Sequence, residues 1–261
     1  MQVTQLCHKL LLGTTHLKRL NTLSDVVSTS LNFKTLSATQ IARKLKGSAK
    51  TKSNIRKVDR LLSNEKLLDD VEAIYSAMNR WILTSSRPYL NIDGSKLLNS
   101  KFYTLRATLQ LKGRGITVYE TVYTQKENGS PKLYKRFVNG LKRVIPKHCQ
   151  PILVTDAEFR VPWFMMVLKK GWDFIGRIRG DRYIALDSHL CSYNHVSELY
   201  KVQMLEKPES LGYGELNKTN ALEGYFYRYK SKPKGRHAYT RSGRHSETDK
   251  SKRYAKEHKE A

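Results

Sequence analysis

The chain has 261 residues, enough for one sizeable core and a smaller accessory domain, and its 48 Lys and Arg against 23 Asp and Glu give a formal net charge of +25. The hydrophobic fraction is 39% and no apolar run is long enough to span a bilayer, which argues against a membrane-spanning protein. Three scattered Cys and the lack of a secretory signal pattern argue against a disulfide-bonded secreted protein.

The positive charge is the strongest signal in the composition. So much charge of one sign is costly to a compact fold unless a polyanion neutralises it. Nucleic acid is the first expectation and an anionic membrane surface a weaker one, because no strongly amphipathic basic helix flanked by Trp and Phe is present. We therefore expect a cytoplasmic, nucleoid-associated protein that binds nucleic acid and no membrane.

Residues 1–84 carry apolar residues at helical spacing and are predicted to form a small all-α domain. Ser37, with Gln40 three residues later, predicts one helix start, and residues 55–62 are predicted as the next helix. Two short helices about a turn that contains Gly47 resemble a helix-turn-helix in layout.

Basic side chains of these two helices are candidates for contacts with DNA phosphates or base edges. They are Lys44, Lys50, Lys52, Arg56, Lys57 and Arg60. The solvated basic face of an ordinary helical bundle explains the same residues equally well. A further helix over residues 71–84 is predicted to follow, with Trp81 packed against the sheet.

Residues 85–180 follow the order strand, strand, strand, helix, strand, helix, strand. Residues 88–93 and 151–156 are short apolar runs, each opened by Pro and closed by Asp. The remaining predicted elements are a hairpin over 101–124, a helix over 132–144 after Ser130-Pro131, a helix from Val161-Pro162 that includes Leu168, and a strand over 172–178. This pattern predicts an α/β domain with a mixed sheet.

Asp93 and Asp156 close two of these strands. Side by side in a sheet they could share a divalent metal, because a hard cation prefers carboxylate oxygens. An Asp after a strand also commonly caps a turn or a helix, and for either residue alone that interpretation is favoured. Two Asp-ended strands together in a very basic chain favour the metal-binding interpretation over the capping one. Arg177 and Arg179 leave the last strand on one face.

Residues 181–261 show a weaker pattern. Short strand-like segments at 183–186 and 225–230 suggest an incomplete β-rich insertion. The last thirty or so residues are rich in Lys, Arg, Ser and His, so we expect a basic tail that is disordered by itself.

The order of elements in residues 85–180 is that of a ribonuclease-H-like fold, and four stretches resemble the bacterial cut-and-paste transposases of the IS-four family, most closely its branch that carries antibiotic-resistance transposons. The stretches are His16-Leu-Lys-Arg-Leu-Asn21, Thr51-Lys-Ser-Asn-Ile-Arg-Lys-Val-Asp-Arg-Leu-Leu62, Ile152-Leu-Val-Thr-Asp-Ala-Glu-Phe-Arg-Val-Pro-Trp163 and Gly171-Trp-Asp-Phe-Ile-Gly-Arg-Ile-Arg-Gly180. The resemblance runs along essentially the whole chain.

The resemblance implies an active site of two Asp and one Glu that binds two magnesium ions, for which manganese is expected to substitute. Asp93 corresponds to the first acid and Asp156 to the second. Arg177 falls where the family places a basic residue near the DNA backbone, and Arg179 is a further DNA-binding candidate at the same strand end. The helical amino-terminal domain is expected to bind the terminal inverted repeats, with target DNA as a second nucleic-acid partner and self-association in the DNA-bound complex.

Departures from the family pattern concern the active site. The family's third acid lies in a signature of Tyr, Arg, Glu and Lys, and residues 181–261 contain no such spacing. Gly94 and Lys96 stand where relatives often carry Trp and Asp, and Glu158 stands where a small residue is usual. The resemblance therefore predicts a transposase truncated before the third acid, with very low catalysis and retained DNA binding.

Two other functions explain the same residues. A DNA-binding fragment without catalysis could inhibit transposition by occupying the repeats or by joining dead assemblies. A basic RNA-binding or ribosome-associated protein, in which both Asp are only turn residues, is the alternative from another class.

Overall fold

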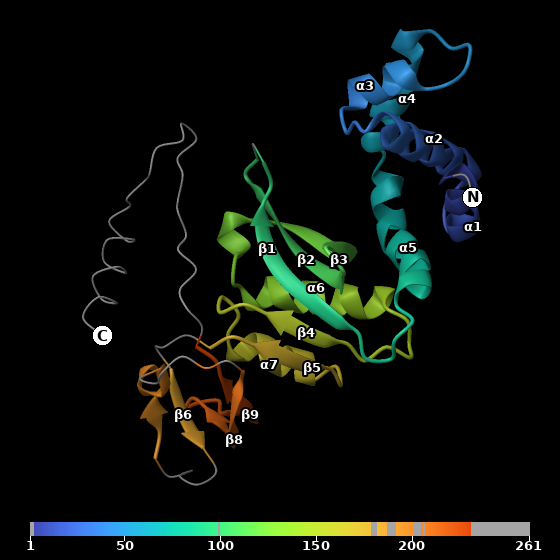
Figure 1. The fold of residues 1–261 in the computed structure, drawn as a ribbon. Helices are drawn as coiled ribbons and strands as arrows, with labels where there is room; N and C mark the ends of the chain where they lie inside the picture. The colour runs from blue at the N-terminus through green and yellow to red at the C-terminus, as the bar shows by residue number, and fades with distance from the viewer. Residues whose placement is uncertain are drawn as a thin grey trace. The chain divides into compact units, whose positions relative to one another are not determined.

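The computed structural model describes residues 3–98, 100–178, 182–186, 192–200, 205 and 207–230. The chain divides into two compact units, Met1–Arg179 and Gly180–Ala261. The described part is mixed α/β, with seven α-helices and two sheets (Figure 1). Within it, none of the helices combines the length and apolarity that a membrane span requires.

Five helices open the first unit. They are α1 Val3–Leu11, α2 Leu17–Phe33, α3 Ala38–Lys44, α4 Thr51–Leu62 and α5 Glu65–Ile82. Ser37 caps α3 as predicted, since its hydroxyl accepts a hydrogen bond from the backbone N–H of Gln40 (3.4 Å). Both α4 and α5 begin earlier than predicted: the first turn of α4 is polar, and the start of α5 has only Leu67 and Leu68 among charged residues. Asn64 caps α5 by accepting from the backbone N–H of Lys66 (3.0 Å).

Two small apolar clusters hold these helices together. The first joins α1, α2 and α5 and consists of Leu11, Leu20 and Ala77. The second joins α3 and α4 and consists of Ile41, Ala42 and Val58, with Val26 of α2 packed against it.

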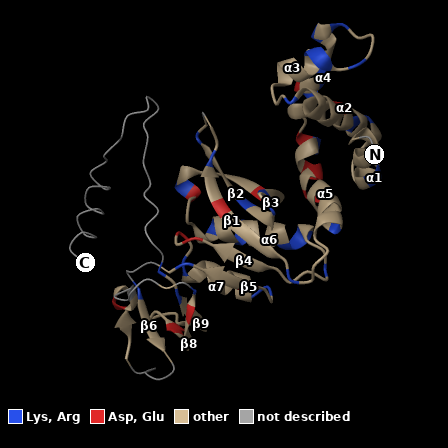
Figure 2. Cartoon of the chain, in the orientation of Figure 1, with Lys and Arg blue, Asp and Glu red and all other residues tan. Residues whose placement is uncertain are grey.

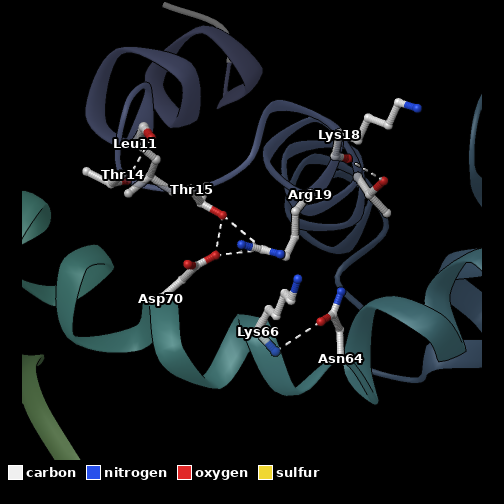
Figure 3. A network of polar contacts seen from close by, with 9 residues as sticks. Leu11, Thr14, Thr15, Lys18, Arg19, Asn64, Lys66 and Asp70 are labelled. Carbon is white, nitrogen blue, oxygen red and sulfur yellow. Dashed lines mark hydrogen bonds and ion pairs between the residues drawn. The ribbon is translucent and has the colours of Figure 1, made fainter.

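A mostly buried ion pair ties α2 to α5 (Figure 3). Arg19 Nε lies 2.7 Å from Asp70 Oδ2, and the two side chains are only 14% and 13% exposed. The hydroxyl of Thr15 donates to the same carboxylate oxygen. Burial opposes ionisation of Asp70, but the hydrogen bonds from Thr15 and Arg19 and the charge of Arg19 outweigh it, so the pKa of Asp70 lies below its usual value.

The central sheet has the strand order β3-β2-β1-β4-β5 (Figure 1). Its strands are β1 Tyr89–Lys96, β2 Phe102–Leu111, β3 Arg114–Thr124, β4 Ile152–Thr155 and β5 Asp173–Gly176. β2 pairs antiparallel with β1 and β3, whereas β4 pairs parallel with β1 and β5. The predicted hairpin and the predicted order of elements are confirmed.

Helices α6 Pro131–Val144 and α7 Val161–Leu168 cover one face of this sheet, and a short 3-10 helix, Gln125–Glu127, precedes α6. Phe137 of α6 packs on Tyr119 of β3, and Phe164 of α7 stacks on Phe174 of β5. The predicted inner face of α6 is buried in full; it consists of Leu133, Phe137, Leu141 and Val144. Leu168, expected in the core, is 40% exposed because it lies in the last turn of α7.

Asn79 joins α5 to the sheet. It is fully buried, and its Nδ2 donates to the carbonyl oxygens of Val118 (3.0 Å) in β3 and Val144 (3.1 Å) at the end of α6. Trp81, which was expected to pack on the sheet, is 48% exposed and has Lys9 Nζ 5.1 Å from its ring centroid. Two residues along a helix rotate a side chain by about 200°, so Trp81 points away when Asn79 faces the sheet.

The second unit contains an antiparallel sheet with the order β7-β6-β8-β9. Its strands are β6 Tyr183–Leu186, β7 Asn194–His195, β8 Glu209–Leu216 and β9 Leu222–Arg228, and a 3-10 helix, Val196–Tyr200, follows β7. Both strand-like segments predicted here overlap a strand, β6 and β9. The predicted basic tail lies outside the described residues.

Candidate functional site

Asp93 and Asp156 follow the paired parts of two neighbouring strands. In the parallel pairing of β1 with β4, Ile92 lies opposite Thr155, and the next residues are Asp93 and Asp156. Neighbouring strands lie about 4.8 Å apart and paired residues point to the same face, so this register places Asp93 and Asp156 directly after neighbouring paired positions. Both side chains are exposed. The adjacency of the two strands is the arrangement predicted from the sequence.

Each carboxylate makes one local hydrogen bond. Asp93 Oδ2 accepts from the hydroxyl of Ser95 (3.1 Å), and Asp156 Oδ1 accepts from the backbone N–H of Glu158 (2.9 Å). The second bond is an Asx turn, so the turn-forming role of Asp156 is real. One oxygen of each carboxylate is left outside these two bonds and is available to a ligand.

Glu158 is the acidic residue near this edge whose role was not foreseen. Burial and, next, the charge of Glu158 raise the pKa of both Tyr123 and Tyr134; Asp93 adds to this at Tyr123 and Asp156 at Tyr134. The charge of Glu158 thus acts on both tyrosines, that of Asp93 on Tyr123 and that of Asp156 on Tyr134. Across the parts of the chain that the structure describes, however, no three or more His, Cys, Asp or Glu side chains are placed to hold one metal ion.

Two arginines flank the Asp pair. Arg106 of β2 lies opposite Asp93, and its Nη2 pairs with Glu120 Oε2 of β3 at 2.8 Å. Arg177 follows β5, and its backbone N–H donates to the carbonyl oxygen of Thr155 (3.3 Å), the residue before Asp156. The Arg177 side chain is exposed. Arg179, the other arginine predicted at this strand end, lies outside the described residues.

The predicted DNA-contacting residues of the helical region fall into two groups. Lys52, Arg56 and Arg60 recur every fourth residue on α4 and are exposed, and basic residues of α4 and of the loop before it are blue in Figure 2. Among the described residues, none of the ion pairs involves these three. In contrast, Lys44 Nζ lies 5.2 Å from the ring centroid of Phe33, and Lys57 Nζ pairs with Asp25 Oδ2 at 2.9 Å.

The outer side of α4 also forms a shallow hollow. It has a volume of about 490 Å³ and is lined by Ser53, Arg56, Asp59, Arg60 and Ser63. The connection between α3 and α4 covers residues 45–50, which is longer than the three to four residues usual in a helix-turn-helix. The layout resembles that motif but has a longer connection between its two helices, of which α4 carries the exposed basic residues.

The donor chemistry at Asp93 within β1 and Asp156 directly after β4 suits a hard cation, since exposed carboxylate oxygens and water are the ligands that Mg²⁺ prefers. The basic side of α4 suits phosphate groups. These are separate parts of the first unit, one on the sheet and one on a helix. No protein-family model, curated protein or solved structure matches this chain.

Proposed function

We propose that this chain is a DNA transposase by descent, which binds terminal inverted repeats and cleaves and transfers DNA strands with a divalent metal. The observation that carries the proposal is the parallel pairing of β1 with β4, in which Asp93 and Asp156 directly follow the paired residues Ile92 and Thr155. The strand order β3-β2-β1-β4-β5 is additional support, because it is the order expected of a ribonuclease-H-like fold.

The two carboxylates fit a magnesium site of modest strength. Asp93 and Asp156 would hold the ion through the oxygens that their bonds to Ser95 and Glu158 leave available. Mg²⁺ is commonly held by one or two carboxylates, with water and substrate phosphate completing its coordination. Bound here, the ion would supply Lewis-acid polarisation of a phosphodiester. Arg177 would bind a phosphate oxygen beside the pair.

Catalysis by the chain alone is expected to be slow. A two-metal mechanism needs ligands for both ions, and in the described part of the chain no third carboxylate completes such a set. DNA binding does not depend on a complete set of metal ligands. Lys52, Arg56 and Arg60 of α4 would contact the phosphates of the repeat, and the bound DNA would bring copies of the chain together.

The first test combines metal binding with DNA nicking. We expect titration calorimetry to show Mg²⁺ binding that Asp93→Asn and Asp156→Asn weaken about tenfold or more, since each removes one of two charged ligands. The same variants are expected to abolish the slow Mg²⁺-dependent nicking of a supercoiled plasmid. Asp173→Asn is the matched control, because Asp173 is also exposed but begins β5 at the other end of the sheet. Unchanged metal binding in both site variants would contradict the proposal.

A DNA-binding inhibitor without catalysis is the second candidate. It is favoured by the Asx turn at Asp156, which gives this residue a structural role that needs no metal. Tight binding to a terminal repeat with no nicking at any metal concentration would select it. A preference for RNA over duplex DNA would overturn both candidates and select a basic RNA-binding protein.

A further inference from the structure

Tyrosines with large exposed fractions line one side of β9. Tyr225, Tyr227 and Tyr229 occupy alternate positions along this strand and its end, and they are 71%, 66% and 53% exposed. We name these three residues the tyrosine stripe. Alternate residues of a strand point to the same face, so the three side chains share one side. In the described part of the second unit, β9 is one of the two edge strands of its sheet.

The opposite face of the same sheet is the core of this unit. Ile184, Val196, Leu216 and Leu222 are buried there. The exposed tyrosines are therefore not needed to close the core. Exposed aromatic residues that gather on one face of a small sheet mark a binding surface more often than a structural one.

The spacing of the tyrosine stripe matches stacked nucleobases. Residues two apart on a strand are separated by about 6.7 Å, which is roughly twice the 3.4 Å rise between stacked bases. Rings that stand parallel at this spacing would admit one base between Tyr225 and Tyr227 and another between Tyr227 and Tyr229. The ring of Tyr225 is held by an edge-to-face contact with Tyr213 of β8, at 5.3 Å between centroids.

Charges of both signs lie on this face of the sheet. Lys218 Nζ lies 5.8 Å from the ring centroid of Tyr183 in β6, two strands from β9, and 5.6 Å from that of Tyr193. Two acids share the face: Glu215 accepts the hydroxyl of Tyr193 and Glu223 that of Tyr213, each at 2.6 Å. Stacking on the rings, rather than charge, is therefore the basis of the binding inferred below. In sequence, Lys230 and a segment in which Lys and Arg outnumber Asp and Glu follow directly.

We infer that the tyrosine stripe binds single-stranded DNA, with its bases stacked between the rings. Base stacking on aromatic side chains tolerates any sequence, since every base presents a π-face. A duplex has its bases already stacked and offers none to this surface. The choice of DNA rather than RNA rests on the proposed function; the stacking itself rests on the geometry of β9.

The test measures binding of the full chain to a labelled oligo-dT of about 12 nucleotides, within the usual site size, by fluorescence anisotropy. The double variant Tyr225→Ser/Tyr227→Ser is expected to weaken binding about tenfold or more. The variant Tyr225→Phe/Tyr227→Phe is expected to stay within about twofold of the unsubstituted chain, because the rings remain. Tyr89→Ser, at a 55% exposed tyrosine of β1, is the matched control with no expected loss.

Three results would overturn the inference. They are full binding by the Ser variant, equal loss in the Phe variant, and an equal loss of affinity for duplex DNA. Tighter binding to an oligo-U RNA than to oligo-dT would overturn the choice of DNA. Photocrosslinking of the unsubstituted chain to iodouracil-containing DNA is expected to label the peptide that carries Tyr225 and Tyr227, independently of any folding defect. Calorimetry measures magnesium binding at Asp93 independently of this test, so the proposed function and the tyrosine-stripe inference can each fail without the other.

Discussion

Asp70 shows how one carboxylate links stability to pH. Its folded-state pKa is depressed, so its contribution to stability is present above its unfolded pKa of about 3.9 and is lost as the pH falls through the lower folded value. At pH 7 we expect Asp70→Asn to lower the free energy of unfolding by about 1–3 kcal/mol, because Arg19 keeps its charge without a charged partner.

Urea unfolding from pH 7 to pH 2 measures this effect. The difference between Asp70→Asn and the unsubstituted chain is expected to shrink below about pH 4. Asp173→Asn breaks an exposed pair with Arg87, where both side chains are 55% exposed, and should cost less than about 0.5 kcal/mol. A cost at Asp70 that stays constant over the whole pH range would show that the ionised carboxylate is not what stabilises the α2–α5 contact.

At the scale of elements, α6 is placed against the sheet by a residue with no side chain. A Cβ at Gly140 would lie 2.0 Å from Tyr119 Oη and 2.4 Å from its Cζ. Ala in an exposed helix interior is more favourable than Gly by about 1 kcal/mol, but here we expect Gly140→Ala to destabilise the protein by about 1–3 kcal/mol because α6 or the buried ring of Tyr119 must shift.

Chemical denaturation of Gly140→Ala measures this cost. The double variant Gly140→Ala/Tyr119→Leu is expected to lose less stability than the sum of its two single variants, since the shorter side chain removes the ring that obstructs the new Cβ. An increase in stability on Gly140→Ala alone would contradict the close approach of α6 to Tyr119.

For the whole molecule, the net charge of +25 predicts DNA binding that weakens steeply with salt. If Lys52, Arg56 and Arg60 each neutralise one phosphate, replacing all three by Ala lowers the slope of log Kobs against log salt concentration by about 2.7. Lys44→Ala/Lys57→Ala is the control, since these cations already contact Phe33 and Asp25 and should change the slope less.

Anisotropy with a duplex oligonucleotide between about 50 and 200 mM salt gives these slopes. A slope that is unchanged by the triple Ala variant would place the DNA contacts elsewhere on the chain. A larger change in the control than in the triple variant would likewise show that the exposed side of α4 is not the binding surface.

The sequence by itself determined the elements whose signals are local. The two-residue alternation of β2, the Ser130-Pro131 start of α6 and the four apolar positions of its inner face all depend on neighbours along the chain. Such patterns predict secondary structure directly. They failed at the polar first turn of α4, where no apolar residue marks the helix, and at the start of α5, where Leu67 and Leu68 are followed by two acids.

Only the tertiary structure decided which of these elements meet. A hairpin and a helix separate Asp93 from Asp156 in sequence, and only the parallel pairing of β1 with β4 shows that the two residues follow neighbouring paired positions. The rotation of α5 placed Asn79 rather than Trp81 against the sheet. Lys57 pairs with Asp25 of α2, whereas its neighbour Arg56 is exposed on α4. Each outcome depends on contacts between distant segments, which the local pattern of residues does not contain.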